Sequence, residues 1–196
     1  MLVREFQSLL LEGVSADAPA APSALADEVT AHFDQLRNPL LRYLLSFGLL
    51  TQDGEEIIQE VFLALFQHLR RGGSRRNLRG WIFRVAHNLG LRRCNINRAE
   101  TRLFTQSSEQ NADVPLDPDP NPEERWSHRQ RQQRLLAVVE ALAEQDRRCL
   151  YLRAEGLRYR EITGVLGMSL GAVALSLERS LARLSRADGR EHHATR

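Results

Sequence analysis

The sequence has no lysine, little cysteine and no long apolar run. All 27 basic residues among its 196 are arginine. Codon usage in a GC-rich genome explains this as well as a function in which guanidinium groups bind phosphates. Cys94 and Cys149 have no CxxC partner, which argues against a disulfide framework or zinc module and favours a reducing compartment. The most apolar stretch, Pro39–Leu50, is interrupted by Arg42 and falls short of the roughly 20 residues of a membrane span. We therefore expect a soluble, cytoplasmic protein without a membrane span.

Motifs of catalysis and metal binding are also missing. The sequence contains no GKS/T loop, HExxH motif or nucleophile elbow. Its histidines are scattered, at His32, His68, His87, His128, His192 and His193. We expect no enzymatic activity, no cofactor and no metal site.

Charge alternates along the chain. The net charge of +2 is the sum of −7 over residues 1–69, +9 over 70–102, −6 over 103–124 and +6 over 125–196. The near-neutral total therefore conceals a chain whose segments are in turn acidic, basic, acidic and basic.

Apolar spacing predicts helices in the first half of the chain. From Leu25 to Leu44 the apolar residues recur every three or four positions, with Ser23 as a cap and Pro39 as a point where the helix bends or divides. Asp53 is the predicted N-cap of a second helix, whose apolar stripe ends at Leu69. A third helix begins near position 81 and runs into an arginine-rich end.

The second half of the chain is also predicted to be helical, after a segment that has no helical pattern. Residues 105–124 contain four prolines and six acidic residues, too little apolar surface to bury a core. Beyond them we expect helices near 135–142, 146–154, 159–166 and 170–186, with Gly156 and Gly167 in turns and Ser169 as a cap. The sequence thus predicts an all-α protein: an extension (1–24), a helical domain (25–104), an extended acidic linker (105–124), a second helical domain (125–187) and a tail (188–196).

Three clusters are candidate sites, each with an ordinary structural explanation. Arg160–Leu184 has the pattern of a helix-turn-helix, although a plain helical hairpin has it too. Trp81–Arg93 mixes aromatic and arginine residues, as expected for unpaired nucleic acid or for a core with a solvated face. The acidic residues from Asp53 to Glu60 could be a helix cap with a solvated face, or a protein-docking surface. A metal site is the least consistent alternative, because the acidic residues are spread around the helix.

Taken together, these segments resemble a known family. DGEEIIQEVFLALF (Asp53–Phe66) and LRGWIFRVAHNLGLRR (Leu78–Arg93) resemble region 2 of sigma-70-type RNA polymerase sigma factors, and Leu136–Leu184 resembles their region 4. The short chain with only a linker between the regions is similar to the extracytoplasmic-function (group IV) subclass. The resemblance implies a factor that binds core RNA polymerase and directs promoter recognition, DNA melting and transcription initiation.

The resemblance also implies roles for individual residues. Contacts with the clamp coiled coil of the largest polymerase subunit fall on Asp53, Glu56, Gln59 and Glu60. Contacts with the melted −10 element fall on Gly73, Ser74, Arg75, Arg76, Asn77, Arg79, Trp81, Arg84, His87, Asn88, Arg92 and Arg93. Contacts with the −35 element fall on Arg158, Arg160, Ser169, Leu170, Gly171, Ala172, Ala174, Leu175, Arg179 and Arg183. The family further allows an anti-sigma factor as a partner of such a chain.

One departure from the family keeps alternatives open. Where its recognition helix commonly reads G-T-V-K-S-R-L, this chain has Ala174 and Ser176 in place of the basic residues expected to face DNA. Leu175 could contact a thymine methyl or belong to a protein-facing surface. A sigma-like DNA-binding regulator that does not initiate, or a protein-binding helical adaptor, are therefore alternatives to an active sigma factor.

Overall fold

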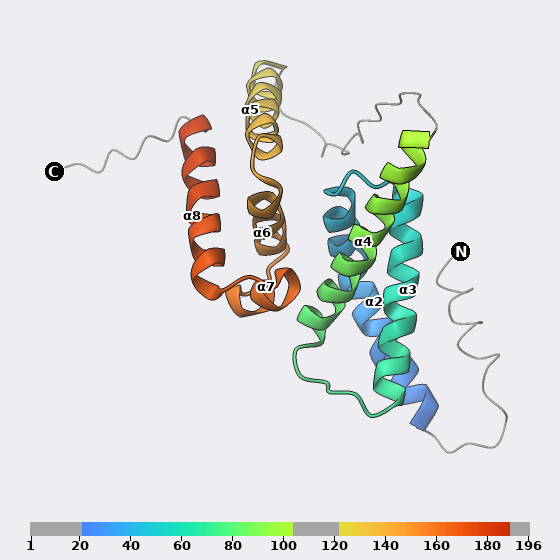
Figure 1. Ribbon diagram of the computed structural model, residues 1–196. Coiled ribbons are helices and arrows are strands. Elements are labelled where there is room, and N and C mark those ends of the chain that lie inside the picture. The colour runs from blue at the N-terminus through green and yellow to red at the C-terminus, as the bar shows by residue number, and fades with distance from the viewer. Residues whose placement is uncertain (1–20, 104–121, 189–196) are drawn as a thin grey trace. The chain divides into compact units, whose positions relative to one another are not determined.

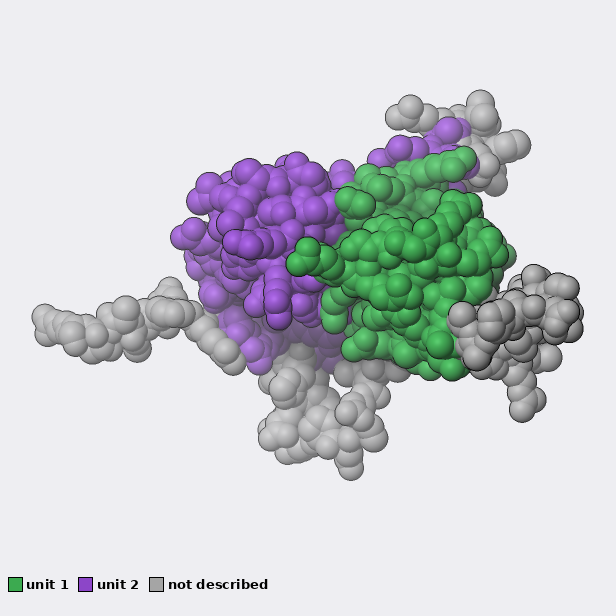
Figure 2. Space-filling view, turned by 90° about the horizontal axis from the view of Figure 1, so that it is seen from below, with its two compact units in different colours: residues 1–94 green, residues 95–196 purple. Residues whose placement is uncertain are grey.

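The computed structural model describes residues 21–103 and 122–188, and within these ranges the chain is entirely helical. The helices are α2 (Ala21–Leu45), α3 (Thr51–Arg70), α4 (Leu78–Leu103), α5 (Pro122–Glu140), α6 (Glu144–Ala154), α7 (Tyr159–Leu166) and α8 (Leu170–Ala187) (Figure 1). They divide between two compact units, residues 1–94 and 95–196 (Figure 2). The predicted all-α class is confirmed.

The first unit is built from α2, α3 and the first part of α4. The helices bury one face each, and the aromatic rings of Phe33 and Phe62 meet edge to face with centroids 5.1 Å apart. Gly54 allows α3 to approach α2, because a Cβ there would lie 2.8 Å from Leu41 Cδ1. Gly90 does the same for α4, where a Cβ would lie 2.7 Å from the ring of Phe47. The buried apolar side chains of this unit are Val29, Phe33, Leu36, Leu40, Tyr43, Leu44, Leu49, Ile57, Ile58, Val61, Phe62, Leu65, Leu69, Leu78, Ile82, Phe83 and Ala86.

The second unit packs α8 against α5, α6 and α7. Helix α6 ends in a Schellman motif: Gly156 has φ +85°, and the N–H of Leu157 donates to the carbonyl of Leu152 at 3.0 Å. Gly167, with φ +67°, turns the chain between α7 and α8, which are inclined by 105°. The hydroxyl of Ser169 then accepts from the N–H of Ala172 at 3.2 Å. The predicted turns at Gly156 and Gly167 and the predicted cap at Ser169 are confirmed.

Several predicted helix boundaries differ from those observed. Helix α2 begins at Ala21, before the expected cap at Ser23, and it continues through Pro39 without dividing. Leu36, Leu40 and Tyr43 around the proline are buried, and this burial offsets the lost backbone hydrogen bond. The N-cap of α3 is Leu50, so Asp53 lies inside the first turn. Helix α5 begins at Pro122, within the segment expected to be linker, because proline is well suited to the first helical position.

In the described ranges, no single helix has both the length and the apolar character of a membrane span. Only α7 and α8 taken together, with the bend between them, reach that length and composition.

Candidate nucleic-acid and protein interfaces

The loop between α3 and α4 is held at both ends by local backbone geometry. At the end of α3, Gly72 has φ +76° and the N–H of Gly73 donates to the carbonyl of His68 at 2.9 Å. At the start of α4, Asn77 has φ +56° and its Oδ1 accepts from the N–H of Gly80 at 3.1 Å. Asn77, expected to contact DNA, thus caps α4, and the loop has a defined shape.

His68, near the end of α3, contacts both this loop and the first turn of α4. Its ring stacks on Trp81, with centroids 4.9 Å apart and planes 26° apart, and its Nε2 lies 3.2 Å from the carbonyl oxygen of Ser74. A Cβ at Gly73 would lie 2.4 Å from the imidazole, so only glycine fits against it. Sequence reasoning gave His68 no role, since its partners lie six and thirteen positions away on other elements.

Trp81 is the first residue of a largely polar face of α4. The spacing from Trp81 to Arg84, Asn88 and Arg92 places these four residues on one side of the helix. Arg84, Asn88 and Arg92 are exposed, while Trp81 is half-buried by the stack with His68. The guanidinium of Arg79 is also half-buried and lies 6.0 Å from the ring centre of Phe83, which belongs to the core.

His87 does not belong to this face, and the expectation that it lines a DNA strand is corrected. Its side chain is 6% exposed, and its Nδ1 lies 2.8 Å from the hydroxyl of Tyr43 on α2. Phe47 meets the same imidazole edge to face at 5.7 Å. Neighbouring residues of a helix point in different directions, so His87 faces the core while Asn88 lies in the exposed row.

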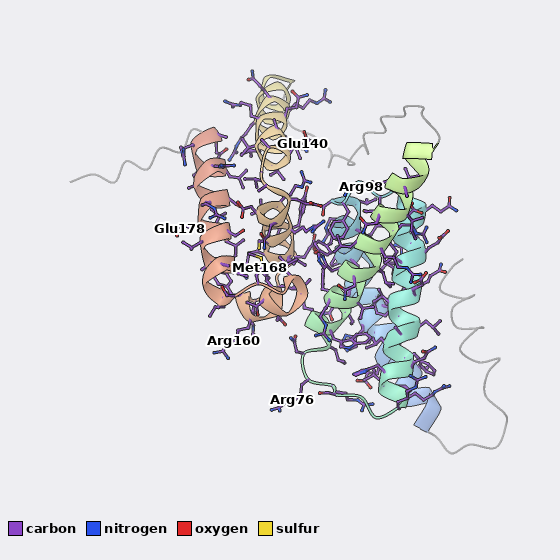
Figure 3. The ribbon with its side chains drawn as sticks, viewed as in Figure 1. Arg76, Arg98, Glu140, Arg160, Met168 and Glu178 are labelled. Atoms are coloured by element: carbon purple, nitrogen blue, oxygen red, sulfur yellow. The ribbon has the colours of Figure 1, made fainter. Side chains whose placement is uncertain are left out.

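Two arginines of the loop differ in their surroundings. The Nε of Arg75 lies 3.2 Å from both carboxylate oxygens of Glu28, which ties the loop to α2. Arg76 is exposed and extends away from the loop (Figure 3). The backbone N–H of Arg76 donates to the hydroxyl of Ser74 at 3.2 Å. Both arginines are exposed, and Arg75 is the one that an ion pair holds against α2.

The acidic surface of α3 is smaller than the sequence suggested. Arg93 of α4 donates to Asp53 at 2.5 Å and to Glu56 at 3.1 Å. The hydrogen bonds with Glu56 and then Asp53 raise the pKa of the Arg93 guanidinium above its ordinary value. Asp53 and Arg93, predicted to contact the polymerase and DNA respectively, thus form an ion pair between α3 and α4. Gln59 and Glu60 are exposed to solvent. Among the described residues, no group of three or more His, Cys, Asp and Glu side chains could hold a metal ion.

The helix-turn-helix of α7 and α8 presents a mixed surface. Arg158, Arg160, Leu170, Gly171, Leu175, Arg179 and Arg183 are exposed, and Ala172 and Ala174 are half-buried. Ser176 is fully buried, and its hydroxyl donates to Asp146 of α6 at 2.7 Å. The expectation that Ser176 stands at a DNA-facing position is therefore wrong in this structure, since that position points into the unit.

Asp146 joins α6 to α8, and its ionisation is expected to make the second unit acid-sensitive. Burial raises the pKa of this carboxyl, but the hydrogen bond from Ser176 and the ion pair with Arg179 at 2.9 Å outweigh burial and lower it. A lowered pKa stabilises the folded unit above the ordinary aspartate pKa of about 3.9, and this contribution is lost as the pH falls through the lowered value.

We expect Asp146→Asn to reduce the free energy of unfolding at pH 7 by about 1–3 kcal/mol, because the ion pair with Arg179 is lost and the hydrogen bond from Ser176 is weakened. Thermal unfolding of both proteins from pH 7 to pH 2.5 measures the difference, which should shrink below pH 4. A constant difference across this range would contradict the assigned role of the carboxylate, and Glu140→Gln, at an exposed position, is the control.

Comparison with known proteins identifies two regions of one family in this chain. Residues 32–99 match the family model "Sigma-70 region 2" and residues 132–184 match "Sigma-70, region 4". The chain is 31% identical over 173 residues to the ECF RNA polymerase sigma factor SigE of Mycolicibacterium smegmatis, which covers 86% of this chain and 62% of SigE. It therefore spans less than two thirds of the length of that relative. It is 28% identical over 146 residues to the RNA polymerase sigma factor CnrH of Cupriavidus metallidurans, covering 71% of this chain and 75% of CnrH.

Solved structures show the same fold. The sigma factor RpoE of Bartonella quintana, crystallised with the anti-sigma factor NepR, superposes with a TM-score of 0.65 at 15% identity, covering 84% of this chain and 98% of RpoE. CnrH in complex with the cytosolic domain of CnrY gives a TM-score of 0.52 at 21% identity, covering 96% and 97% of the two chains. With both region models matched in order over more than half of the chain, the chain belongs to the sigma-70 family.

Proposed function

We propose that this chain binds core RNA polymerase, recognises promoters, melts them and so initiates transcription, without catalysing a reaction itself. The observation that carries the proposal is the exposed row of Arg84, Asn88 and Arg92 continuing from Trp81, beside a loop of defined shape. A single strand needs such a surface, because its phosphates require positive charge and its bases require an aromatic face. Such a function places the protein in the cytoplasm, with the polymerase.

Charge and geometry support a division of roles within the first unit. Residues 70–102 carry a net charge of +9, which favours the binding of a polyanion. In the proposal, the loop from Gly73 to Asn77 receives a flipped base of the −10 element, and the exposed row of α4 follows the non-template strand. Flipping a base costs a few kcal/mol, and stacking on Trp81 offsets part of that cost.

The acidic side of α3 serves a different partner in this proposal. Gln59 and Glu60 contact the clamp coiled coil of the polymerase, with Glu56 at the edge because it also binds Arg93. Leu63, one turn after Gln59 and 50% exposed, adds an apolar contact. Exposed charge beside an exposed leucine is the composition of a protein interface, with a polar rim around an apolar anchor.

The second unit and the remaining segments complete the proposal. Helices α7 and α8 bind the −35 element, with α8 in the major groove. In the proposal, residues 105–124 are the acidic linker between the two DNA-binding domains, 25–104 and 125–187. Residues 105–121 of this segment lie outside the described ranges. An anti-sigma factor is a further proposed partner, since RpoE was solved in complex with the anti-sigma factor NepR and CnrH in complex with the cytosolic domain of CnrY.

Transcription with purified core polymerase on a library of genomic promoters tests the proposal. We expect transcripts that begin at discrete sites only when the chain is added. Binding to core polymerase without any specific transcript would overturn an initiating role and favour a sigma-like regulator. Binding to neither polymerase nor DNA would favour a helical adaptor.

A further inference from the structure

The outward surface of the first two turns of α8 has no polar side chain. Leu170 and Leu175 are 49% and 57% exposed, Gly171 is exposed, and Ala172 and Ala174 are partly exposed. The preceding Ser169 uses its hydroxyl oxygen to cap the helix. A recognition helix usually reads bases with hydrogen-bonding side chains in these turns, and none is present here.

The orientation of this surface follows from the side of α8 that is buried. Val173, Ser176, Leu177 and Ser180 face the interior of the unit, and Ser176 is held there by Asp146. Figure 3 shows Glu178 directed away from α6. Leu175 precedes Glu178 by three residues and Arg179 by four, so it lies on the same outward side.

Arginines surround the apolar residues. Arg158 and Arg160 are exposed at the start of α7, and Figure 3 shows Arg160 extending away from that helix. Arg179 and Arg183 are exposed further along the side of α8 that carries Leu175. Arg179 also forms the ion pair with Asp146, but 60% of its side chain remains exposed. Residues 125–196 have a net charge of +6. An apolar centre with arginines around it is complementary to DNA, whose phosphates flank the base edges in the major groove.

Only one base presents an apolar group in the major groove, namely thymine with its C5-methyl group. Building on the proposed function of the second unit, we propose that Leu175 reads the thymine methyl group in the −35 element, so that the sequence preference there comes from apolar contact. The arginines bind the phosphates on either side and set the register of α8 without choosing the base.

Replacing thymine by uracil removes the methyl group and leaves base pairing unchanged. Holoenzyme made from core polymerase and the full chain is first used to select promoters from a library with a randomised −35 region. Selected sites are expected to contain thymine at a fixed position, and uracil at that position should weaken promoter binding about fourfold, which corresponds to the burial of one methyl-sized group. The variant Leu175→Ala should bind the thymine and uracil promoters equally.

A control variant and a second readout separate this inference from the proposed function. Leu181→Ala removes another exposed leucine of α8 and should keep the full response to uracil. Equal binding of thymine and uracil promoters by the unaltered chain, or a response to uracil that persists in Leu175→Ala, would overturn the inference while transcription continued. If Leu175→Ala instead weakened binding to core polymerase with the uracil response intact, Leu175 would belong to a protein interface. Absence of specific transcripts from every promoter would count against the proposed function itself.

Discussion

Trp81→Ala should abolish most promoter opening while leaving the binding of core polymerase unchanged. The Trp81 indole stacks on His68 and Trp81 remains partly exposed, so we expect an unpaired base to stack on the exposed part of the ring. Alanine substitution at a base-stacking aromatic typically costs about 1–3 kcal/mol per base, which corresponds to a loss of about 5- to 150-fold in open complexes. Permanganate reactivity of promoter thymines measures the open complex directly.

Trp81→Phe is the matched variant, because phenylalanine keeps an aromatic face both for His68 and for a base. We expect it to retain most of the opening activity. His68→Ala leaves the indole in place but removes its support and the contact with the Ser74 carbonyl. It should therefore reduce opening less than Trp81→Ala does. Normal opening by Trp81→Ala, with its helical content and unfolding temperature preserved, would show that α4 presents a different group to the strand.

Glu60→Arg should weaken the binding of core polymerase by about 100-fold or more. Glu60 is exposed on the acidic side of α3. The polymerase surface that binds this side is therefore expected to be positively charged. Reversing the charge places like charges opposite each other, which costs several kcal/mol at a protein interface. Fluorescence anisotropy of labelled chain titrated with core polymerase gives the dissociation constant, and the loss should shrink as salt is raised.

Asp34→Arg makes the same change of charge at an exposed position of α2 in the same unit. It should leave the dissociation constant within about twofold, because a surface charge away from the interface contributes little. Unchanged binding by Glu60→Arg would remove this side of α3 from the polymerase interface. Equal losses in the two variants would indicate a response to net charge alone.

Local patterns in the sequence were sufficient to predict most of the helices. Apolar residues three and four positions apart reflect the helical repeat itself, and they located the buried stripe from Ile57 to Leu69. The turn at Gly156 and the cap at Ser169 were predictable for the same reason, since each depends on residues within six positions. The predicted helix of residues 135–142 proved much longer and ended at Glu140, because the polar start of α5 has little apolar periodicity.

Which polar side chains face solvent was much harder to predict. His87 and Asn88 are neighbours with similar chemistry, yet His87 binds Tyr43, which is 44 positions away, and Asn88 is exposed. Ser176 binds Asp146, 30 positions away, and Arg93 binds Asp53, 40 positions away. None of these pairs follows from helical periodicity, because a pair on different helices meets only when the helices pack at a particular distance and rotation.

The family, the all-α class and the alternation of charge could all be predicted from composition and from motifs that are local in the chain. The tertiary structure alone decided which members of each motif can reach a partner. It turned His87 and Ser176 inward, paired Asp53 with Arg93, and placed His68 beneath Trp81. The physical reason is that the burial of a polar group depends on the partner that satisfies its hydrogen bonds, and in this protein most such partners lie on a different helix.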